Sequence, residues 1–144
     1  MCIRDRGRGA VAVVGSTGAF AGQPFVSSYS AAKAFQVNLV EGLWSELEGT
    51  GVDVLDALIG STDTPARTRR LGVAFDPSVD MTSEEVALDI LDHLGDGPTR
   101  VISKGTSGIG SLAAPWAGFR ALAVPTMGAA MSGFRARTDV PAGG

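Results

Sequence analysis

Residues 16–33 of this 144-residue chain read STGAFAGQPFVSSYSAAK. The stretch contains Tyr29-x-x-x-Lys33, and Ser16 lies thirteen positions before the tyrosine. Two side chains four residues apart on a helix lie on one face, a single turn apart. An ammonium group that close to a phenol favours loss of the phenol proton, and such a tyrosine can exchange a proton with a carbonyl or alcohol oxygen. A serine hydroxyl arriving from a preceding strand can hydrogen-bond the same oxygen, so the three residues predict interconversion of an alcohol and a carbonyl.

The stretch resembles the catalytic segment of the short-chain dehydrogenase/reductase family, classical type. The family pattern is a strand ending in Ser, then about a dozen residues with small residues and a proline, then Tyr-x-x-x-Lys. The positions that fit this pattern are Ser16, Gly22, Pro24, Tyr29, Ala32, Lys33 and Ala34. The resemblance implies an α/β fold with a Rossmann-like doubly wound parallel sheet. It also implies hydride transfer between a nicotinamide cofactor, NAD or NADP, and a small-molecule carbonyl or alcohol substrate.

The resemblance further assigns a role to each of the three residues. Tyr29 would be the general acid/base, and Ser16 would hold the substrate oxygen. Lys33 would bind the nicotinamide ribose and promote ionisation of the tyrosine. The family's further catalytic asparagine lies upstream of the serine, and no residue of this sequence matches it.

The residues before the serine predict a strand, and they weigh against a hydrolase. Residues 10–15, Ala-Val-Ala-Val-Val-Gly, form a continuous apolar run that is typical of a strand buried on both faces of a parallel sheet. A nucleophile elbow would make Ser16 a hydrolase nucleophile, but that motif needs glycine two places earlier, where Val14 stands. The single histidine, His93, has no evident relation to Ser16, and without a second histidine or a nearby cysteine it predicts no metal site.

A long helix is predicted from about Ser28, capped by Ser27 or Ser28 and ended by Gly49 and Gly51. Apolar residues recur every four positions at Phe35, Leu39, Leu43 and Leu47, with Val40 and Trp44 beside them, whereas Glu41, Glu46 and Glu48 face elsewhere. This pattern predicts an amphipathic helix packed on the sheet. In the family the equivalent helix commonly packs against its copy, so the resemblance implies a homo-oligomer formed through residues 29–48. Trp44 fits either role, and core packing is favoured.

Residues 52–59, Val-Asp-Val-Leu-Asp-Ala-Leu-Ile, predict the next parallel strand. The following residues 59–65 are similar to the family's Pro-Gly-x-Val/Ile-x-Thr segment, which contacts the nicotinamide carboxamide. Ile59 stands where the family has proline, and Thr62 stands where it has an aliphatic residue. The resemblance implies that Gly60, Thr62 and Thr64 line the nicotinamide, Thr62 through its backbone N–H and Thr64 through its hydroxyl. The alternative is a polar turn after a strand.

Residues 65–77 correspond to the family's mobile substrate lid and contain Arg67, Arg69 and Arg70. These arginines attract an anionic substrate or a cofactor phosphate, or they form a solvated face, which is the favoured interpretation. Residues 82–85, Thr-Ser-Glu-Glu, form a capping box before a helix that ends near Gly95, with an apolar stripe of Val86, Ala87, Ile90 and Leu94. Residues 99–103 predict a final strand.

The C-terminal region carries one misleading motif and one apolar segment. Residues 105–110, GTSGIG, resemble a phosphate loop, but the first glycine of that motif falls on Lys104 and the loop should open the fold, so a flexible turn is predicted. Residues 111–134 are apolar and small, and they would line a substrate pocket, seal a dimer or touch a membrane surface. Two prolines and Arg120 argue against a membrane span.

Composition excludes several classes of protein. A net charge of −3 lacks the basic footprint of a nucleic-acid binder. The single cysteine, Cys2, excludes an intrachain disulfide and favours a reducing, cytoplasmic location. No apolar run reaches the ~18 residues of a transmembrane helix. The start, Met-Cys-Ile-Arg-Asp-Arg, lacks the apolar core of a secretory signal.

We divide the sequence into a foreign-looking or linker start (1–8), the C-terminal part of a short-chain dehydrogenase/reductase domain (9–137) and a disordered tail (138–144). The family's N-terminal cofactor-binding half, with its phosphate loop, is not recognisable. We therefore interpret the chain as the C-terminal half of a longer enzyme. The alternative is a non-catalytic fragment or oligomerisation module, because a missing phosphate loop leaves the cofactor site incomplete and an apolar strand edge exposed.

Overall fold

A parallel sheet of three strands lies at the centre of this computed structural model, which describes residues 6–72, 74–104, 115, 116, 118–120 and 122–129. In chain order the elements are β1 (Gly9–Ser16), the short 3-10 helix η1 (Thr17–Ala19), α2 (Ser27–Leu47), β2 (Val52–Ile59), α3 (Pro65–Leu71), α4 (Ser83–Asp92) and β3 (Thr99–Ile102). Helical residues between 115 and 129 follow. The expected strands and the two long helices are thereby confirmed.

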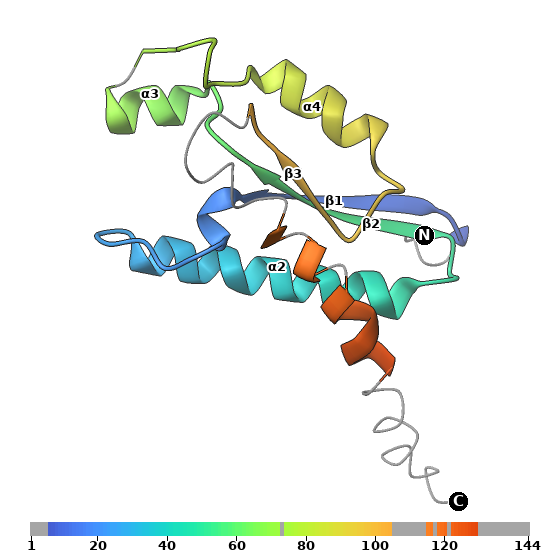
Figure 1. Cartoon of the computed structure of the whole chain (residues 1–144). Coiled ribbons are helices and arrows are strands. Elements are labelled where there is room, and N and C mark those ends of the chain that lie inside the picture. The colour runs from blue at the N-terminus through green and yellow to red at the C-terminus, as the bar shows by residue number, and fades with distance from the viewer. Residues whose placement is uncertain (1–5, 73, 105–114, 117, 121, 130–144) are drawn as a thin grey trace, which may run out of the picture.

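The strand order β1-β2-β3 puts β2 in the middle, and both pairings are parallel. Helix α2 covers one face of the sheet, and α4 covers the other (Figure 1). The fold is therefore α/β with a partial, doubly wound sheet. Because the strands are parallel, Ser16, Ile59 and Ile102 end them at one edge, which is where open α/β sheets bind ligands.

The core lies on both faces of β2. Toward α4, Leu55 and Ala57 pack with residues of that helix and of β3, namely Val86, Ile90 and Ile102. On the opposite face, Leu58 packs with Val37 of α2 and Ala19 of η1. Residues 54–58 of β2 are all buried, Asp56 included, as is typical of a strand covered on both faces.

Strand β1 does not match the expectation of burial on both faces. Val11 and Val14 are exposed, Val14 by 50 %. These valines are exposed because β1 is the outermost strand of the described sheet. It pairs with β2 on one side, and among the described residues no strand pairs with it on the other side. The same run of valines would be covered in the middle of a wider sheet, so the prediction was wrong about burial but correct about the strand.

Helix α2 begins one residue before the predicted start, and neither predicted serine caps it. Its N-cap position is Val26, which makes no side-chain capping bond. Ser30 ties the helix to the preceding loop instead, since its hydroxyl accepts a hydrogen bond from the Gln23 N–H (3.1 Å). The Ser30 hydroxyl also lies 3.2 Å from the carbonyl oxygen of Val26.

The predicted apolar stripe of α2 does not face the sheet. Phe35 is 69 % exposed, and Leu39 and Leu43 are also exposed, whereas the buried positions are Ser30, Val37, Val40 and Glu41. Apolar residues occupy two sides of this helix, so the four-residue repeat alone did not identify the buried side. Trp44 is half-buried and lies against Gly97, where an added Cβ would come 2.8 Å from the Trp44 Cδ1. It therefore packs within the chain, as favoured.

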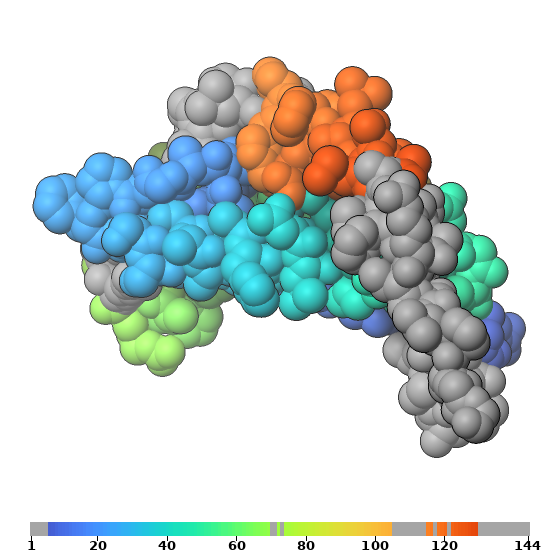
Figure 2. Space-filling view, turned by 90° about the horizontal axis from the view of Figure 1, so that it is seen from below, coloured from blue at the N-terminus to red at the C-terminus, as the bar shows by residue number. Residues whose placement is uncertain are grey.

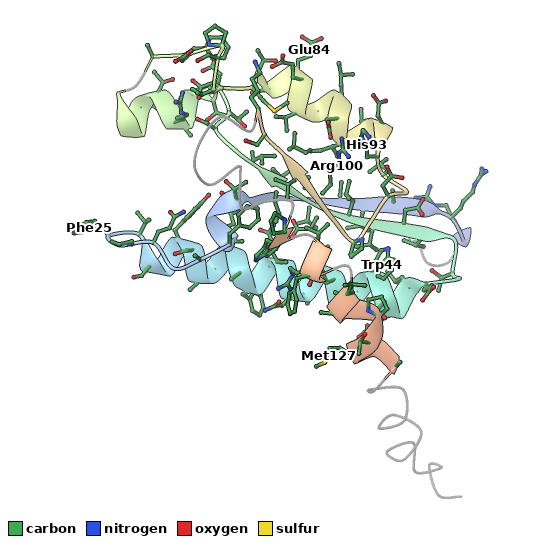
Figure 3. The ribbon with its side chains drawn as sticks, in the orientation of Figure 1. Phe25, Trp44, Glu84, His93, Arg100 and Met127 are labelled. Atoms are coloured by element: carbon green, nitrogen blue, oxygen red, sulfur yellow. The ribbon has the colours of Figure 1, made fainter. Side chains whose placement is uncertain are left out.

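Helix α4 confirms the predicted capping box. The Thr82 hydroxyl accepts a hydrogen bond from the Glu85 N–H (3.1 Å), and the Glu85 carboxylate accepts one from the Thr82 N–H (2.7 Å). The helix ends at Asp92 with His93 as its C-cap, slightly earlier than predicted. Arg100 of β3 binds Asp89 of α4 with Nη2 3.0 Å from Oδ2, and Figure 3 shows His93 and Arg100 close to each other.

The described C-terminal helical residues lie along α2 (Figure 2). Arg120 pairs with the buried carboxylate of Glu41, which also accepts a hydrogen bond from the Thr99 hydroxyl (3.0 Å). The Trp116 ring lies 4.6 Å from that of Phe20 and 4.8 Å from the Arg120 guanidinium. No helix in the described part of the chain is long and apolar enough to cross a membrane. The predicted turn at 105–110 and tail at 138–144 lie outside the described residues.

Candidate active site

Ser16 is the last residue of β1, and its side chain points toward η1, the segment that follows the strand. The hydroxyl oxygen accepts a hydrogen bond from the Gly18 N–H (3.1 Å), which caps η1. The bond fixes the hydroxyl oxygen at the carboxyl end of the strand. The hydroxyl hydrogen is a donor that this contact does not use.

Tyr29 lies in the first turn of α2 and approaches the same place. A Cβ added to Gly18 would come 3.0 Å from the Tyr29 Cε1 and 3.3 Å from the Ser16 Oγ. Gly18 therefore separates the two side chains, and its lack of a side chain lets them share one site. The tyrosine is 40 % exposed, and its hydroxyl bonds to no residue in the described part of the chain. The tyrosine side chain is thus partly accessible, and it lies near the Ser16 hydroxyl.

Lys33 lies one turn after Tyr29 and reaches β1. Its Nζ donates hydrogen bonds to the carbonyl oxygen of Val14 (3.2 Å) and to the side-chain oxygen of Gln36 (3.1 Å). An ammonium group has three N–H donors, so these contacts leave one N–H for a further acceptor. The structure shows no hydrogen bond between Lys33 and Tyr29 among its described contacts. The lysine is held at the strand end by the backbone instead.

Gly60, Thr62 and Thr64 follow the end of β2 at the same edge of the sheet. Thr62 is buried and its hydroxyl donates to the Gly60 carbonyl oxygen (3.2 Å). The Thr64 hydroxyl accepts a hydrogen bond from the Arg67 N–H (3.2 Å) and caps α3. These contacts give all three residues local structural roles. The described contacts join none of them to Ser16, Tyr29 or Lys33.

The arginine-rich segment after Thr64 is partly accounted for by an ion pair. Arg67 Nη1 lies 3.0 Å from the Asp80 Oδ2, and Asp80 is buried. Hydrogen bonds from the Ser61 side chain and the Asp76 N–H, together with the charge of Arg67, hold the pKa of Asp80 below its usual value. Arg67 therefore holds α3 in place, and it differs from the freely solvated arginine that the charge pattern suggested.

Sequence reasoning missed two buried acidic residues, one on α2 and one on β2. Glu41 was expected to face elsewhere than the apolar stripe, and it is 3 % exposed and paired with Arg120. Asp56 interrupts the apolar run of β2 and is fully buried. Burial raises the pKa of Asp56 to about 6, and a hydrogen bond from Gln36 opposes the rise. The signal that could have identified Asp56 is in the sequence, where this acidic residue stands between the apolar residues Val54-Leu55 and Ala57-Leu58.

The loop before α2 carries one exposed aromatic residue. Phe25 has a positive φ of 67°, which is unusual for a bulky residue. Figure 3 shows its ring pointing outward from the tip of the loop, and the side chain is exposed. The loop that carries this ring connects β1, which ends at Ser16, to α2, which carries Tyr29.

Comparison with known proteins agrees with the resemblance of the catalytic segment. Residues 1–71 match the family described as short chain dehydrogenase. The curated relatives include a 7β-hydroxysteroid dehydrogenase from Clostridium sardiniense, 34 % identical over 95 residues that cover 64 % of this chain and 36 % of the relative. A 7β-hydroxysteroid dehydrogenase from Collinsella aerofaciens is 36 % identical over 93 residues, which cover 61 % and 35 %.

Solved structures share the fold as well. A short-chain dehydrogenase from Sphingobium yanoikuyae in complex with NADPH superposes with a TM-score of 0.62 at 26 % identity, over 87 % of this chain and 47 % of that one. A structure described for 7β-hydroxysteroid dehydrogenase stereoselectivity gives a TM-score of 0.58 at 32 % identity, over 69 % and 40 %. The chain spans about a third of the length of the curated relatives it matches, 36 % and 35 %.

Proposed function

Because this chain belongs to the short-chain dehydrogenase family, we propose that it contributes the Ser16, Tyr29 and Lys33 site of an NAD(P)-dependent oxidoreductase. The reaction would transfer a hydride between a nicotinamide cofactor and a carbonyl or alcohol substrate. The observation that carries this proposal is the convergence of Ser16 and Tyr29 on Gly18, with Lys33 bound at Val14 two residues before the serine.

Each residue has a task that its surroundings permit. The Tyr29 residue is 40 % exposed, and a phenol at an accessible position can give a proton to a carbonyl oxygen or take one from an alcohol. Ser16 keeps its hydroxyl hydrogen available, because its described contact uses only the oxygen, and it would donate to the same substrate oxygen. Together they would fix the reacting oxygen in a pair of hydrogen bonds, which is the positioning that such a proton transfer needs.

The residues present fit a nicotinamide cofactor at one point in particular. Lys33 retains one N–H beyond its two described acceptors, and a ribose hydroxyl is a suitable third acceptor. Gly60, Thr62 and Thr64 lie at the same carboxyl edge of the sheet, where dinucleotides bind in such folds. The Thr64 hydroxyl uses its oxygen for the cap of α3, and its hydrogen stays available to a carboxamide. The bound nicotinamide would supply or accept the hydride.

We further propose a bulky apolar substrate, such as a hydroxysteroid. Two relatives at 34 % and 36 % identity are named as 7β-hydroxysteroid dehydrogenases. The exposed ring of Phe25, on the loop between Ser16 and Tyr29, is suited to an apolar partner. A similar solved structure holds NADPH, so NADP is proposed as a cofactor alongside NAD. A cytoplasmic location stays a prediction.

A second candidate function is association through α2. Phe35, Leu39 and Leu43 are exposed along one side of this helix, and such a stripe favours contact with another apolar surface. This exposed apolar side would be the contact surface of a homo-oligomer formed through residues 29–48. This function does not require cofactor binding, so the two candidates are separable.

Titration of NADH and NADPH into the 144-residue chain tests the oxidoreductase proposal. Saturable nicotinamide fluorescence and a raised melting temperature are the expected results, since a ligand that binds only the folded state stabilises it. Tyr29→Phe should keep cofactor binding and lower turnover of a 7β-hydroxysteroid by roughly a hundredfold to ten-thousandfold. Turnover by Tyr29→Phe equal to the original chain would exclude the tyrosine as the acid/base.

Absence of binding by a folded chain would contradict catalysis by this chain and leave the association function. Sedimentation of the chain beside Leu39→Ser then decides the second candidate. A concentration-dependent dimer that Leu39→Ser weakens would support it. A monomer at every concentration would reject it.

A further inference from the structure

Asp56 is the one acidic residue among the buried positions 54–58 of β2, and its side chain contacts Gln36 of α2. Its Oδ1 accepts a hydrogen bond from the Gln36 Nε2 (3.2 Å), and its Oδ2 has no hydrogen-bond partner among the described residues. The side chain is fully buried. A buried carboxylate with one oxygen unpartnered is costly, and a fully apolar strand would avoid that cost. The residue therefore needs an explanation beyond packing.

Gln36 connects this carboxylate to the candidate site. Its amide nitrogen donates to Asp56, and its amide oxygen accepts from the Lys33 Nζ (3.1 Å). The chain of contacts therefore runs from the proposed active-site lysine through one neutral amide to a buried acid. Gly15 of β1 leaves room for this pair, because a Cβ there would come 2.7 Å from the Asp56 Oδ1 and 3.1 Å from the Gln36 Nε2.

The charge of Asp56 selects the orientation of the amide. An ionised carboxylate only accepts hydrogen bonds, and an ammonium group only donates them. The Gln36 amide satisfies both neighbours in one orientation, with nitrogen toward Asp56 and oxygen toward Lys33. Rotating the amide by half a turn would place its oxygen against the carboxylate and its nitrogen against the ammonium group. Ionised Asp56 therefore favours the orientation in which the Gln36 amide oxygen faces Lys33 and accepts its hydrogen bond.

We propose that Asp56 is a positioning residue for Lys33 and acts through Gln36, so that the ionisation of Asp56 controls how the lysine is held in the site. The importance of Lys33 for catalysis rests on the proposed function, whereas the coupling itself concerns contacts within this chain. Protonated Asp56 offers a hydroxyl donor and loses its preference for the amide nitrogen. The hold on Lys33 then relaxes.

The electrostatic surroundings place this change near neutral pH. Burial raises the pKa of Asp56 to about 6, opposed by the Gln36 hydrogen bond and reinforced by the charge of Glu41. The cations that favour the ionised form are Lys33 on α2 and Arg120 on the C-terminal helical segment. Val13 of β1 and Thr99 of β3, the neighbours of Asp56 in the sheet, carry no charge. The pH range in which the lysine is held therefore begins close to neutrality.

Nuclear magnetic resonance of the two lysines tests the coupling directly. Lys33 and Lys104 are the lysines of the chain, so labelling lysine side chains gives one reporter and one internal control. In a titration from about pH 4 to about pH 8, the Lys33 Cε and Nζ signals should shift with a midpoint near the pKa of Asp56, about 6. Lys104, which lies 3.8 Å from Glu85, should show no step there.

Three variants identify the route. Asp56→Asn and Gln36→Leu should each abolish the step at Lys33, the first by removing the acid and the second by removing the connecting amide. Asp53→Asn, an exposed acid on the same strand, should leave it intact. A Lys33 signal without a step in the original chain would overturn the proposal, and so would a step that persists in either variant. If Asp56→Asn does not fold, the original chain and Gln36→Leu suffice.

The measurement needs neither cofactor nor substrate, so its outcome is independent of the oxidoreductase proposal. A step at Lys33 in a chain that binds no nucleotide would uphold the coupling and reject the function. Where activity is measured, Asp56→Asn should lose the part of the pH profile centred near pH 6.

Discussion

The ammonium group of Lys33 donates a hydrogen bond to the backbone carbonyl oxygen of Val14, with 3.2 Å between the nitrogen and the oxygen. The contact joins α2 to β1 two residues before Ser16, so the helix that carries Tyr29 is fixed to the strand that carries the serine. A backbone acceptor cannot be altered by substitution of Val14, and this makes the anchor insensitive to that side chain. The contact therefore helps to fix the position of Ser16 relative to Tyr29 and Lys33.

Gly18→Ala should disturb the site without unfolding the chain. The new methyl group would lie 3.0 Å from the Tyr29 Cε1, so the ring must move. Tyr29 is the single tyrosine, and its ring signals in a nuclear magnetic resonance spectrum report the movement without assignment. Gly22→Ala is the matched control, because nothing lies within 4 Å of its Cβ position. Unchanged Tyr29 signals in Gly18→Ala would contradict the packing described for the site.

Asp56 should make stability fall as pH rises. Its folded-state pKa of about 6 lies above the usual value of 3.8, so between these values the folded chain holds a proton that the unfolded chain releases. The stability that this residue contributes is complete below about pH 4 and is lost as pH rises through about 6, by about 3 kcal/mol. Urea unfolding at both ends of this range measures the free energy of unfolding. As pH rises, the stability of Asp56→Asn relative to the original chain should increase. An equal difference at both ends would refute this.

Loss of Arg120 should destabilise the chain more than loss of the whole ion pair. Arg120→Met leaves the Glu41 carboxylate buried, with the Thr99 hydroxyl as a remaining donor, and should cost about 3 kcal/mol. The double variant Glu41→Leu with Arg120→Met removes the buried charge and should recover much of that loss. Denaturant unfolding measures both. A double variant at least as unstable as Arg120→Met would show that the pair stabilises the fold outright.

The capping box of α4 should contribute a smaller, local stability. Thr82→Ala removes the hydroxyl that accepts from the Glu85 N–H and should cost about 1 kcal/mol. Thr82→Ser keeps the hydroxyl and should stay close to the original chain. Thermal unfolding of the two variants side by side distinguishes the capping bond from the mere presence of a substitution. Equal melting temperatures would show that the bond contributes nothing.

Local patterns predicted the elements well, because each depends on neighbours in sequence. The valine-rich run before Ser16, the acidic capping box at Thr82 and the apolar run of β2 each appear as predicted. The spacing of Tyr29 and Lys33 on one helix face is likewise a local property. The proximity of Ser16 and Tyr29 followed from a family pattern, and the placement of both beside Gly18 agrees with it.

Burial was the weaker prediction, because it depends on what surrounds an element. Val14 is exposed because β1 is an edge strand here, and Phe35 is exposed because α2 turns its other side to the sheet. The Thr64 hydroxyl oxygen caps α3, a contact that the sequence reasoning did not predict, and its hydrogen remains a donor. In each case the local sequence allows two environments, and packing selects one.

The sequence by itself determined the order of strands and helices, the parallel α/β class and the Ser16, Tyr29 and Lys33 pattern, since periodicity and spacing are written in consecutive residues. Only the tertiary structure decided that Asp56 of β2 meets Gln36 of α2, twenty residues earlier in the chain. It also decided that Glu41 meets Arg120. Contacts of this kind arise when separate elements pack, and their charge is tolerated because the fold brings a partner to each, which no local pattern reveals.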